Sequence, residues 1–206
     1  PALVMALQLQ GHFFLHAAAF ELDGAMFALS APSGFGKSTL AASLVDAGCT
    51  VHSDDVVPLR QLDGTIVGRQ GQPWIKLWDS ALDAFGKDAA DFDEVLEGFG
   101  KRVVPAITSS DAEVPLRGIF LLAPHLKEDA PIEVRELRRL DGALAIMGNS
   151  YSPEILVGPL AASTLSFAAR IAETVPVRVI SYYRSFENLP AIREAILRDV
   201  LVHPFA

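Results

Sequence analysis

The amino-acid sequence predicts a single α/β domain, residues 1–206, in which helices flank a mixed β-sheet. Two observations carry this prediction. The apolar run Phe27-Ala28-Leu29 leads into a loop of small residues, and Gly36-Lys37-Ser38 then opens a helical pattern. Further apolar segments of strand length alternate with helical patterns along the chain, as is typical of helices packed on a sheet. No internal repeat, low-complexity tract or convincing linker divides the 206 residues.

Composition narrows the class of protein. The chain is 50% hydrophobic with a formal net charge of −8, which fits a compact domain with a sizeable core and argues against nonspecific binding of nucleic acid. No apolar run approaches the roughly 20 residues that span a bilayer, so we expect no membrane partner. A single cysteine, Cys49, excludes an internal disulfide and favours the cytoplasm. The sequence starts at Pro1 rather than Met, which leaves open a segment ahead of it.

A hairpin and a helix are predicted around the loop of small residues. Phe13–Phe20 is an apolar run of strand length, Asp23-Gly24 marks a turn, and Ala25–Ser30 is a second strand that ends at the loop. The helix that follows the loop is expected to end at Gly48, because glycine is the usual residue of a helix C-cap.

The rest of the chain continues the alternation of strands and helices. Thr50–Ser53 is predicted as a strand, and Val56–Leu59 and Thr65–Val67 as a second hairpin. Residues 79–85 are predicted as a short helix with Asp79 or Ser80 as its N-cap. The other predicted elements are strands at 74–78, 117–123, 132–137 and 176–182, helices at 141–147, 160–175 and 187–202, and an acidic helix within 88–105.

The segment Ala31–Ser38, here named the glycine loop, fits a phosphate-binding P-loop between a strand and a helix. Small residues let successive N–H groups point at phosphate oxygens, and the positive end of the following helix favours an anion. Lys37 can reach the β- and γ-phosphates, and the Ser38 hydroxyl can bind Mg²⁺. The motif has glycine where Ala31 stands, which matters only if that residue needs a positive φ. The residues expected to bind the nucleotide are Ser33, Gly34, Phe35, Gly36, Lys37, Ser38 and Thr39.

Two adjacent carboxylates form the second chemical feature. Asp54 and Asp55 end a predicted strand that we expect to neighbour the strand before the glycine loop. Adjacent residues at a strand end point to opposite sides, so one carboxylate can face a metal ion and the other an acceptor hydroxyl. Phosphoryl transfer needs Mg²⁺ and a carboxylate that takes the hydroxyl proton. A turn held by aspartate hydrogen bonds is the alternative interpretation.

Two single residues are weaker candidates. His16 interrupts an apolar strand, where a core histidine with satisfied hydrogen bonds is the usual explanation; beside the loop strand it could instead hydrogen-bond one of the two aspartates. Lys76 alternates with Trp74 and Trp78, so a strand would place all three on one side. It is either a second cation near the γ-phosphate or a surface lysine packed between aromatic rings.

Three segments together resemble the catalytic domain of HPr kinase/phosphorylase: Leu15-His16-Ala17, Ala31–Leu40 and Val51–Asp55. That enzyme phosphorylates a serine on a small phosphocarrier protein, and its fold is related to that of phosphoenolpyruvate carboxykinase. The match covers roughly residues 15–59. The remainder is similar to smaller HPr-kinase-like proteins of bacteria, among them kinases that modify lasso-peptide precursors on a C-terminal serine.

The resemblance implies a P-loop kinase domain that uses ATP and Mg²⁺ and phosphorylates a serine of a peptide or small protein, such as a lasso-peptide precursor. A homo-oligomer is compatible with it. By position, Lys37 and Ser38 would hold phosphates and Mg²⁺, and His16 would lie near the carboxylates. Asp54 is preferred as the base and Asp55 as the metal-facing residue, with the reverse left open.

Two other functions stay open at this stage: a small-molecule kinase with the same site, and a regulatory module that binds nucleotide without catalysis. The sequence also leaves open the acceptor, the choice between ATP and GTP, the reverse phosphorolysis reaction and the oligomeric state. We expect a nucleotide or an acceptor to order residues 88–114, because their charge and glycine content give them little to bury.

Overall fold

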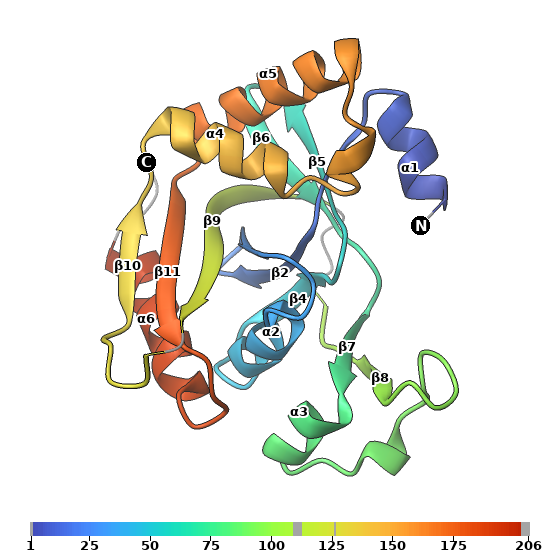
Figure 1. Ribbon diagram of the computed structural model, residues 1–206, viewed down its shortest axis with the longest axis vertical. Coiled ribbons are helices and arrows are strands. Elements are labelled where there is room, and N and C mark those ends of the chain that lie inside the picture. The colour runs from blue at the N-terminus through green and yellow to red at the C-terminus, as the bar shows by residue number, and fades with distance from the viewer. Residues whose placement is uncertain (1, 109–112, 126, 203–206) are drawn as a thin grey trace.

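The computed structural model describes residues 2–108, 113–125 and 127–202 (Figure 1). The strands are β1 (Phe13–Leu15), β2 (Ala17–Leu22), β3 (Ala25–Ser30), β4 (Thr50–Ser53), β5 (Val57–Leu62), β6 (Thr65–Arg69), β7 (Trp74–Trp78), β8 (Lys101–Pro105), β9 (Glu113–His125), β10 (Glu133–Glu136) and β11 (Val177–Tyr183). The helices are α1 (Ala2–Leu9), α2 (Lys37–Val45), α3 (Asp79–Ala84), α4 (Arg139–Gly148), α5 (Gly158–Thr174) and α6 (Leu189–Val202), with short 3₁₀ turns η1 (Ala89–Asp91) and η2 (Pro153–Ile155).

A curled mixed sheet runs through the centre of the molecule. Its strands follow in the order β1-β5-β6-β9-β3-β2-β4, and β9 also pairs with β11, which carries β10. Most neighbours are antiparallel, but β9 runs parallel to both β3 and β11. The carboxyl ends of β3, β9 and β11 therefore meet at one edge of the sheet, which is the edge where the glycine loop begins. This arrangement confirms the predicted mixed α/β fold.

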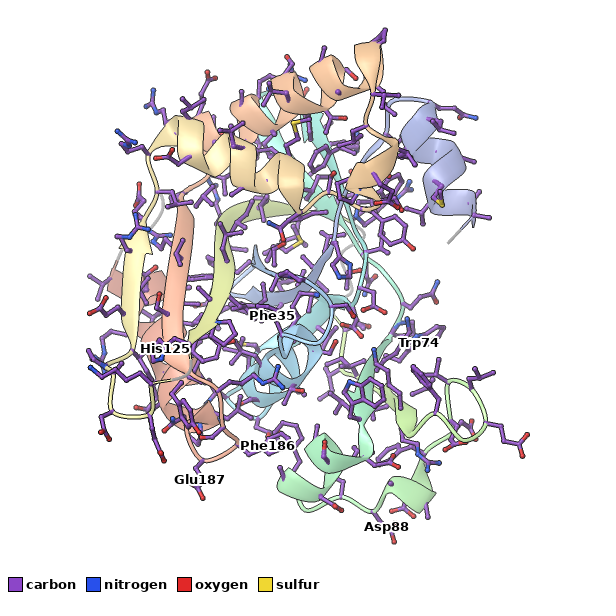
Figure 2. All side chains as sticks on the ribbon, in the orientation of Figure 1. Phe35, Trp74, Asp88, His125, Phe186 and Glu187 are labelled. Atoms are coloured by element: carbon purple, nitrogen blue, oxygen red, sulfur yellow. The ribbon has the colours of Figure 1, made fainter. Side chains whose placement is uncertain are left out.

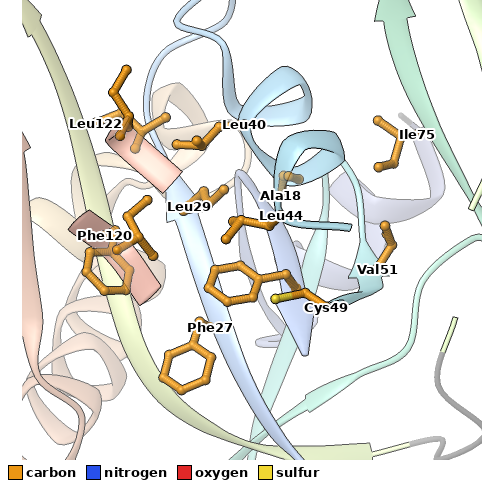
Figure 3. Close-up of a cluster of buried hydrophobic side chains, with 14 of the residues drawn as sticks. Ala18, Phe27, Leu29, Leu40, Leu44, Cys49, Val51, Ile75, Phe120 and Leu122 are labelled. Carbon is orange, nitrogen blue, oxygen red and sulfur yellow. The ribbon is translucent and has the colours of Figure 1, made fainter. Parts of the chain in front are cut away.

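The sheet buries one hydrophobic cluster on each face. Because successive side chains of a strand point to opposite faces, Phe120 belongs to the cluster beneath α2 and α6, whereas Ile119 belongs to the cluster beneath α4 and α5. Phe20 and Phe27 stack in the first cluster with ring centroids 5.3 Å apart. Figure 3 shows Cys49 within the same cluster. Burial raises the pKa of the Cys49 thiol to about 11, as expected for a buried apolar residue rather than a reactive thiol.

The hairpin that leads into the glycine loop is confirmed, with two corrections. β2 and β3 pair across the turn at Asp23-Gly24, where both residues adopt positive φ, as type I′ turns require. The predicted strand Phe13–Phe20 is instead two strands that break at His16, because β1 pairs with β5 whereas β2 pairs with β3 and β4. The expectation that β4 neighbours β3 is also wrong. The tight hairpin places β2 on that edge of β3, and β4 pairs with the other edge of β2.

The segment after β6 forms an arm in which β7 and β8 pair as a separate two-stranded sheet, with α3 between them along the chain (Figure 1). Ile75 and Leu77 are buried in the core, so Lys76 shares the other side of β7 with the two tryptophans, as predicted. α3 begins at Asp79, and its N-cap is Trp78 rather than Asp79 or Ser80.

The predicted acidic helix within 88–105 is wrong. Its place is taken by η1 and then by β8. The Asp88 side chain accepts a hydrogen bond from the Ala90 N–H at the start of η1, and Gly98 and Gly100 adopt positive φ, which a helix does not allow. Residues 109–112, at the end of the segment expected to order on ligand binding, lie outside the described residues.

The predicted helices and strands after residue 116 are confirmed, with ends shifted by one to four residues in most cases. Strand β9 is longer than predicted, because it begins before Arg117 and continues to His125. Among the described helices, none is long and apolar enough to cross a membrane.

Gly71 offers a test of how tightly β4 is held. Its N–H donates to the His52 carbonyl at 2.9 Å, and a Cβ at this position would lie 2.9 Å from the Cβ and 3.2 Å from the Cα of Ser53. These backbone-linked atoms cannot move without displacing Asp54. We expect Gly71→Ala to lower the free energy of unfolding by roughly 1–3 kcal/mol, the usual cost of overpacking, as measured by urea denaturation.

Gly148→Ala is the matched control. Gly148 is the last residue of α4, and a Cβ there would meet nothing within 4 Å. Because alanine favours a helix over glycine by up to about 1 kcal/mol, this variant should be as stable as the wild type or slightly more stable. Equal stability of Gly71→Ala and Gly148→Ala would contradict the close packing of Gly71 against β4.

Candidate functional site

The glycine loop contains two glycines in a left-handed backbone conformation, directly before a helix. Gly34 and Gly36 adopt φ of 84° and 90°, a region that other residues rarely enter, and α2 begins at Lys37. Ala31, which replaces the first glycine of the motif, adopts no positive φ and is buried in the core beneath α2. The alanine therefore introduces no backbone strain.

The ammonium group of Lys37 is buried against the loop that precedes it. Its Nζ donates to the carbonyls of Ala31 at 2.8 Å and Pro32 at 3.2 Å, and it lies 2.9 Å from Nε2 of His16. These three acceptors match the three protons of the ammonium group. Burial lowers the pKa of Lys37, and the nearby carboxylates of Asp55 and Asp54 oppose that shift.

His16 connects Lys37 with the segment that follows β4. Its Nδ1 lies 3.0 Å from the backbone carbonyl of Asp55, so Nδ1 carries the proton and donates. Nε2 is then left as an acceptor for Lys37. Accepting from Lys37 at Nε2 requires a neutral imidazole, and burial together with the charge of Lys37 lowers the pKa of His16. The contact to the aspartate pair that the sequence suggested is therefore made to the Asp55 backbone rather than to a carboxylate.

Asp54 and Asp55 contact different partners, as expected for neighbours at a strand end. Oδ1 of Asp54 accepts from the Ser38 hydroxyl at 2.7 Å, and Oδ2 accepts from the backbone N–H of Lys76 at 2.9 Å. Burial and, after it, the charge of Asp55 raise the pKa of Asp54. The hydrogen bond to Ser38 joins the start of α2 to the end of β4, although β2 lies between β3 and β4.

Asp55 is more exposed than Asp54 and is paired with a cation. Its Oδ2 accepts from Nζ of Lys76 at 2.6 Å. Burial raises the pKa of Asp55, but the hydrogen bond and charge of Lys76 outweigh burial and bring it below its ordinary value. The residue adopts φ 66°, a left-handed conformation that aspartate tolerates better than most residues. Such outliers concentrate at functional sites.

Lys37, Ser38 and Asp55 border a cavity of about 340 Å³, which lies within the range of small-molecule sites. The glycine loop and the start of α2 contribute residues 33–40. The other lining residues are Asp55, Lys76, Trp78, Ser80, Ala81 and Lys101 beside the arm, and Tyr182, Arg184, Ser185, Phe186, Leu189 and Ile192 from β11, α6 and the segment between them. Figure 2 shows Phe35 on the glycine loop and Phe186 on the segment between β11 and α6.

Positive charge is concentrated in this cavity, although the whole chain carries −8. The cations among its lining residues are Lys37, Lys76, Lys101 and Arg184, and Asp55 is the carboxylate. Nη1 of Arg184 donates to the Gly34 carbonyl and so holds the glycine loop from the side of β11. The arrangement suits a polyanion.

Sequence reasoning did not find Arg184 or Phe186. Both follow a predicted strand at its carboxyl end. In open α/β sheets, ligands bind outside the carboxyl ends of the parallel strands. This rule can be applied only when β11 is known to run parallel to β9 and β3, and local sequence patterns do not show that.

Ser38 and Asp54 fit a metal ion that arrives together with phosphates. Within residues 2–108, 113–125 and 127–202, no group of three or more His, Cys, Asp or Glu side chains is placed to hold a metal ion. Mg²⁺ in nucleotide sites is bound by one or two protein oxygens, with phosphates and water completing its coordination. The hydroxyl of Ser38 and the carboxylate of Asp54, already 2.7 Å apart, offer two such oxygens.

Comparison with known proteins finds a structural likeness but no match in sequence. No protein-family model matches the chain, and a search of curated proteins finds no match. Among solved structures, the chain is similar to the HPr(Ser) kinase/phosphatase from Coxiella burnetii, with 16% identity over 92% of this chain and 96% of that chain, at a TM-score of 0.48. The chemistry of the site is therefore inferred from the geometry described above.

The neutral state of His16 predicts a dependence of stability on pH. Its pKa in the folded protein lies below the ordinary value of 6.5, so below that pH the unfolded chain binds a proton that the folded chain does not. Stability then falls as the pH drops, by at most about 1.4 kcal/mol per pH unit for one group. We expect the wild type to lose more unfolding free energy than His16→Gln between about pH 7.5 and about pH 5.5.

The glutamine variant is a suitable reference because its amide both donates and accepts but does not titrate. Burial also lowers the pKa of His52, but this residue is present in both proteins, so its effect cancels in the difference. An identical pH dependence of the two proteins in urea denaturation would show that His16 is not held neutral by its partners.

Proposed function

We propose that this chain is an ATP-dependent, Mg²⁺-requiring kinase that transfers the γ-phosphoryl group to a serine hydroxyl of a peptide or small protein. The observation that carries the proposal is the convergence of the glycine loop, four cations and a carboxylate on one cavity. A kinase needs positive charge to bind and stabilise the phosphoryl group, and a carboxylate beside it to receive the proton.

The glycine loop and the surrounding cations would bind the triphosphate. Backbone N–H groups of the loop and the first turn of α2 would donate to the β- and γ-phosphates. Lys37, now bound to loop carbonyls, and Lys76, now paired with Asp55, would contribute charge on the γ-phosphate side. Mg²⁺, held by Ser38 and Asp54 when the nucleotide is bound, would neutralise charge on the phosphate oxygens.

Asp55 is the better candidate for the base, which reverses the order preferred from the sequence. Its carboxylate lines the cavity, whereas both oxygens of Asp54 already accept hydrogen bonds, from Ser38 and from the Lys76 backbone. Asp55 would take the hydroxyl proton while the serine oxygen bonds to the γ-phosphorus. The bond from that phosphorus to the bridging oxygen of ADP breaks in the same step, leaving phosphoserine and ADP.

Exposed aromatic side chains beside the cavity favour a peptide or protein acceptor over a small molecule. The ring of Trp78, which lines the cavity, packs 5.2 Å from the ring of Phe99, and these residues are 43% and 52% exposed. Exposed aromatic residues are typical of surfaces that bind other chains. A small metabolite bound in the cavity would not need the ring of Phe99, which is not among the residues that line it.

Substitution of each aspartate separates the roles. We expect Asp55→Asn to lower the rate of transfer about 100-fold or more, the usual contribution of a general base, with little change in affinity for MgATP. We expect Asp54→Asn to raise the Mg²⁺ concentration that half-maximal activity requires, because one ligand is weakened. Rates are followed by intact-mass spectrometry of the phosphorylated product over a Mg²⁺ titration.

Asp63→Asn serves as the control, because it makes the same chemical change at an exposed turn between β5 and β6, where asparagine also tolerates the observed φ of 48°. Near-normal turnover in both Asp54→Asn and Asp55→Asn would show that the proposed site is wrong. Loss of transfer in Asp54→Asn alone would restore the order of roles preferred from the sequence.

The acceptor class is tested by incubating the chain with ATP, Mg²⁺ and a panel of serine-containing peptides. The panel includes lasso-peptide precursors ending in serine and a phosphocarrier protein, following the sequence resemblance. We expect a gain of one phosphate on a peptide or protein, lost in Asp55→Asn. ATP consumption only with small hydroxylated metabolites would indicate a small-molecule kinase, and tight nucleotide binding without any product would indicate a regulatory module.

A further inference from the structure

The cavity is chemically uneven, and this unevenness bears on how a nucleotide lies in it. On the side of the arm it is lined by Asp55, Lys76 and Lys101, which are charged. On the side of β11 and α6, Arg184 donates to the glycine loop, and the apolar lining residues are Phe186, Leu189 and Ile192. An apolar wall does not stabilise a phosphate chain, but it does stabilise the flat face of a nucleobase.

The topology fixes which end of a nucleotide would meet which wall. Helix α2 contacts β7 and α6, and Figure 1 shows it between these two elements. If Asp55 is the base, the γ-phosphate lies on the β7 side, next to Asp55 and Lys76. The nucleoside at the other end of the triphosphate then extends past the start of α2 toward α6.

We propose that Phe186, with Leu189 and Ile192 behind it, forms the subsite that binds the nucleobase, and that the base stacks on the Phe186 ring. This inference rests on the proposed function. Phe186 is 46% exposed, whereas Ile192 is 2% exposed. The wall therefore combines an accessible aromatic ring with a buried apolar side chain, the combination that base stacking uses.

The segment that carries Phe186 is held in place before any ligand binds. The Ser185 hydroxyl accepts from the Asn188 N–H at 3.1 Å, and the Asn188 side chain donates to the Tyr183 carbonyl at 3.2 Å. The Phe186 carbonyl accepts from the Leu189 N–H at 3.2 Å. A ring on a pre-ordered segment loses little conformational entropy when a base stacks on it.

The same segment is tied to the glycine loop, so the two subsites keep a fixed separation. Arg184 donates to the Gly34 carbonyl, and the Tyr182 hydroxyl donates to the Phe35 carbonyl at 3.5 Å. Burial raises the pKa of Tyr182 to about 12, so this hydroxyl keeps its proton at neutral pH.

Trp78 is the other aromatic ring that is both exposed and in the cavity, and it is the weaker candidate. Its ring already packs against Phe99 at 5.2 Å and against Nζ of Lys101 at 5.7 Å. It also lies in β7, next to the residues that would surround the γ-phosphate. A base there would leave the apolar wall of α6 without a ligand group.

The test compares a ligand that has a base with one that has none. Isothermal titration calorimetry measures the Kd of MgATP and of magnesium tripolyphosphate for the full chain and for Phe186→Ala, Phe186→Trp and Trp78→Ala. Since stacking on an aromatic ring changes affinity by roughly 5- to 150-fold, we expect Phe186→Ala to weaken ATP by about 10-fold or more and to leave tripolyphosphate unchanged. Phe186→Trp should retain ATP affinity.

Leu140→Ala is the control for removing an exposed apolar side chain, because Leu140 is 70% exposed on α4 and lies outside the cavity. Unchanged ATP affinity in Phe186→Ala would overturn the inference, as would an equal loss for both ligands, which indicates a displaced loop. A larger loss of ATP affinity in Trp78→Ala would assign the base to the opposite wall and also overturn it. If the wild type binds neither ligand, the proposed function is wrong as well. If it binds both ligands and transfers phosphate, the results bear only on the subsite for the base.

Discussion

The candidate site is organised around one buried charge. The Lys37 ammonium group cannot leave water without partners, and the chain supplies them from the glycine loop and from His16. His16 in turn donates to the backbone of Asp55. A single series of contacts thus links the loop before α2, the break between β1 and β2, and the turn after β4. The need to satisfy this charge holds three distant segments of the sequence in one place, and the cavity lies beside them.

The sheet makes this convergence possible. Because β3, β9 and β11 are parallel, the glycine loop and the segment carrying Arg184 and Phe186 emerge at the same edge. Strand β2 pairs antiparallel between β3 and β4, so β4 delivers Asp54 and Asp55 to that edge without being a neighbour of β3. The β7–β8 arm then adds Lys76 and Lys101 from outside the main sheet. Elements from across the length of the chain therefore contribute to one cavity.

The two aspartates show how environment separates identical side chains. Asp54 hydrogen-bonds the Ser38 hydroxyl and the backbone of Lys76, and its pKa is raised; Asp55 is paired with the Lys76 ammonium group, and its pKa is lowered. Adjacent carboxylates whose environments push their pKa values apart are well suited to different roles. Here the hydroxyl oxygen of Ser38 and a carboxylate oxygen of Asp54 lie 2.7 Å apart, while Asp55 lines the cavity.

The sequence by itself determined the features that depend on neighbouring residues. The glycine loop, the turn at Asp23-Gly24 and the alternation of Lys76 with Trp74 and Trp78 follow from backbone freedom and strand periodicity, which act locally. Only the tertiary structure decided the position of β2 between β3 and β4, the replacement of the acidic helix by η1 and β8, and the arrival of Arg184 and Phe186 at the loop. It also decided in which direction the pKa of each aspartate shifts. Strand order, burial and pKa shifts arise from contacts between residues far apart in the chain, and no local pattern specifies which of those contacts form.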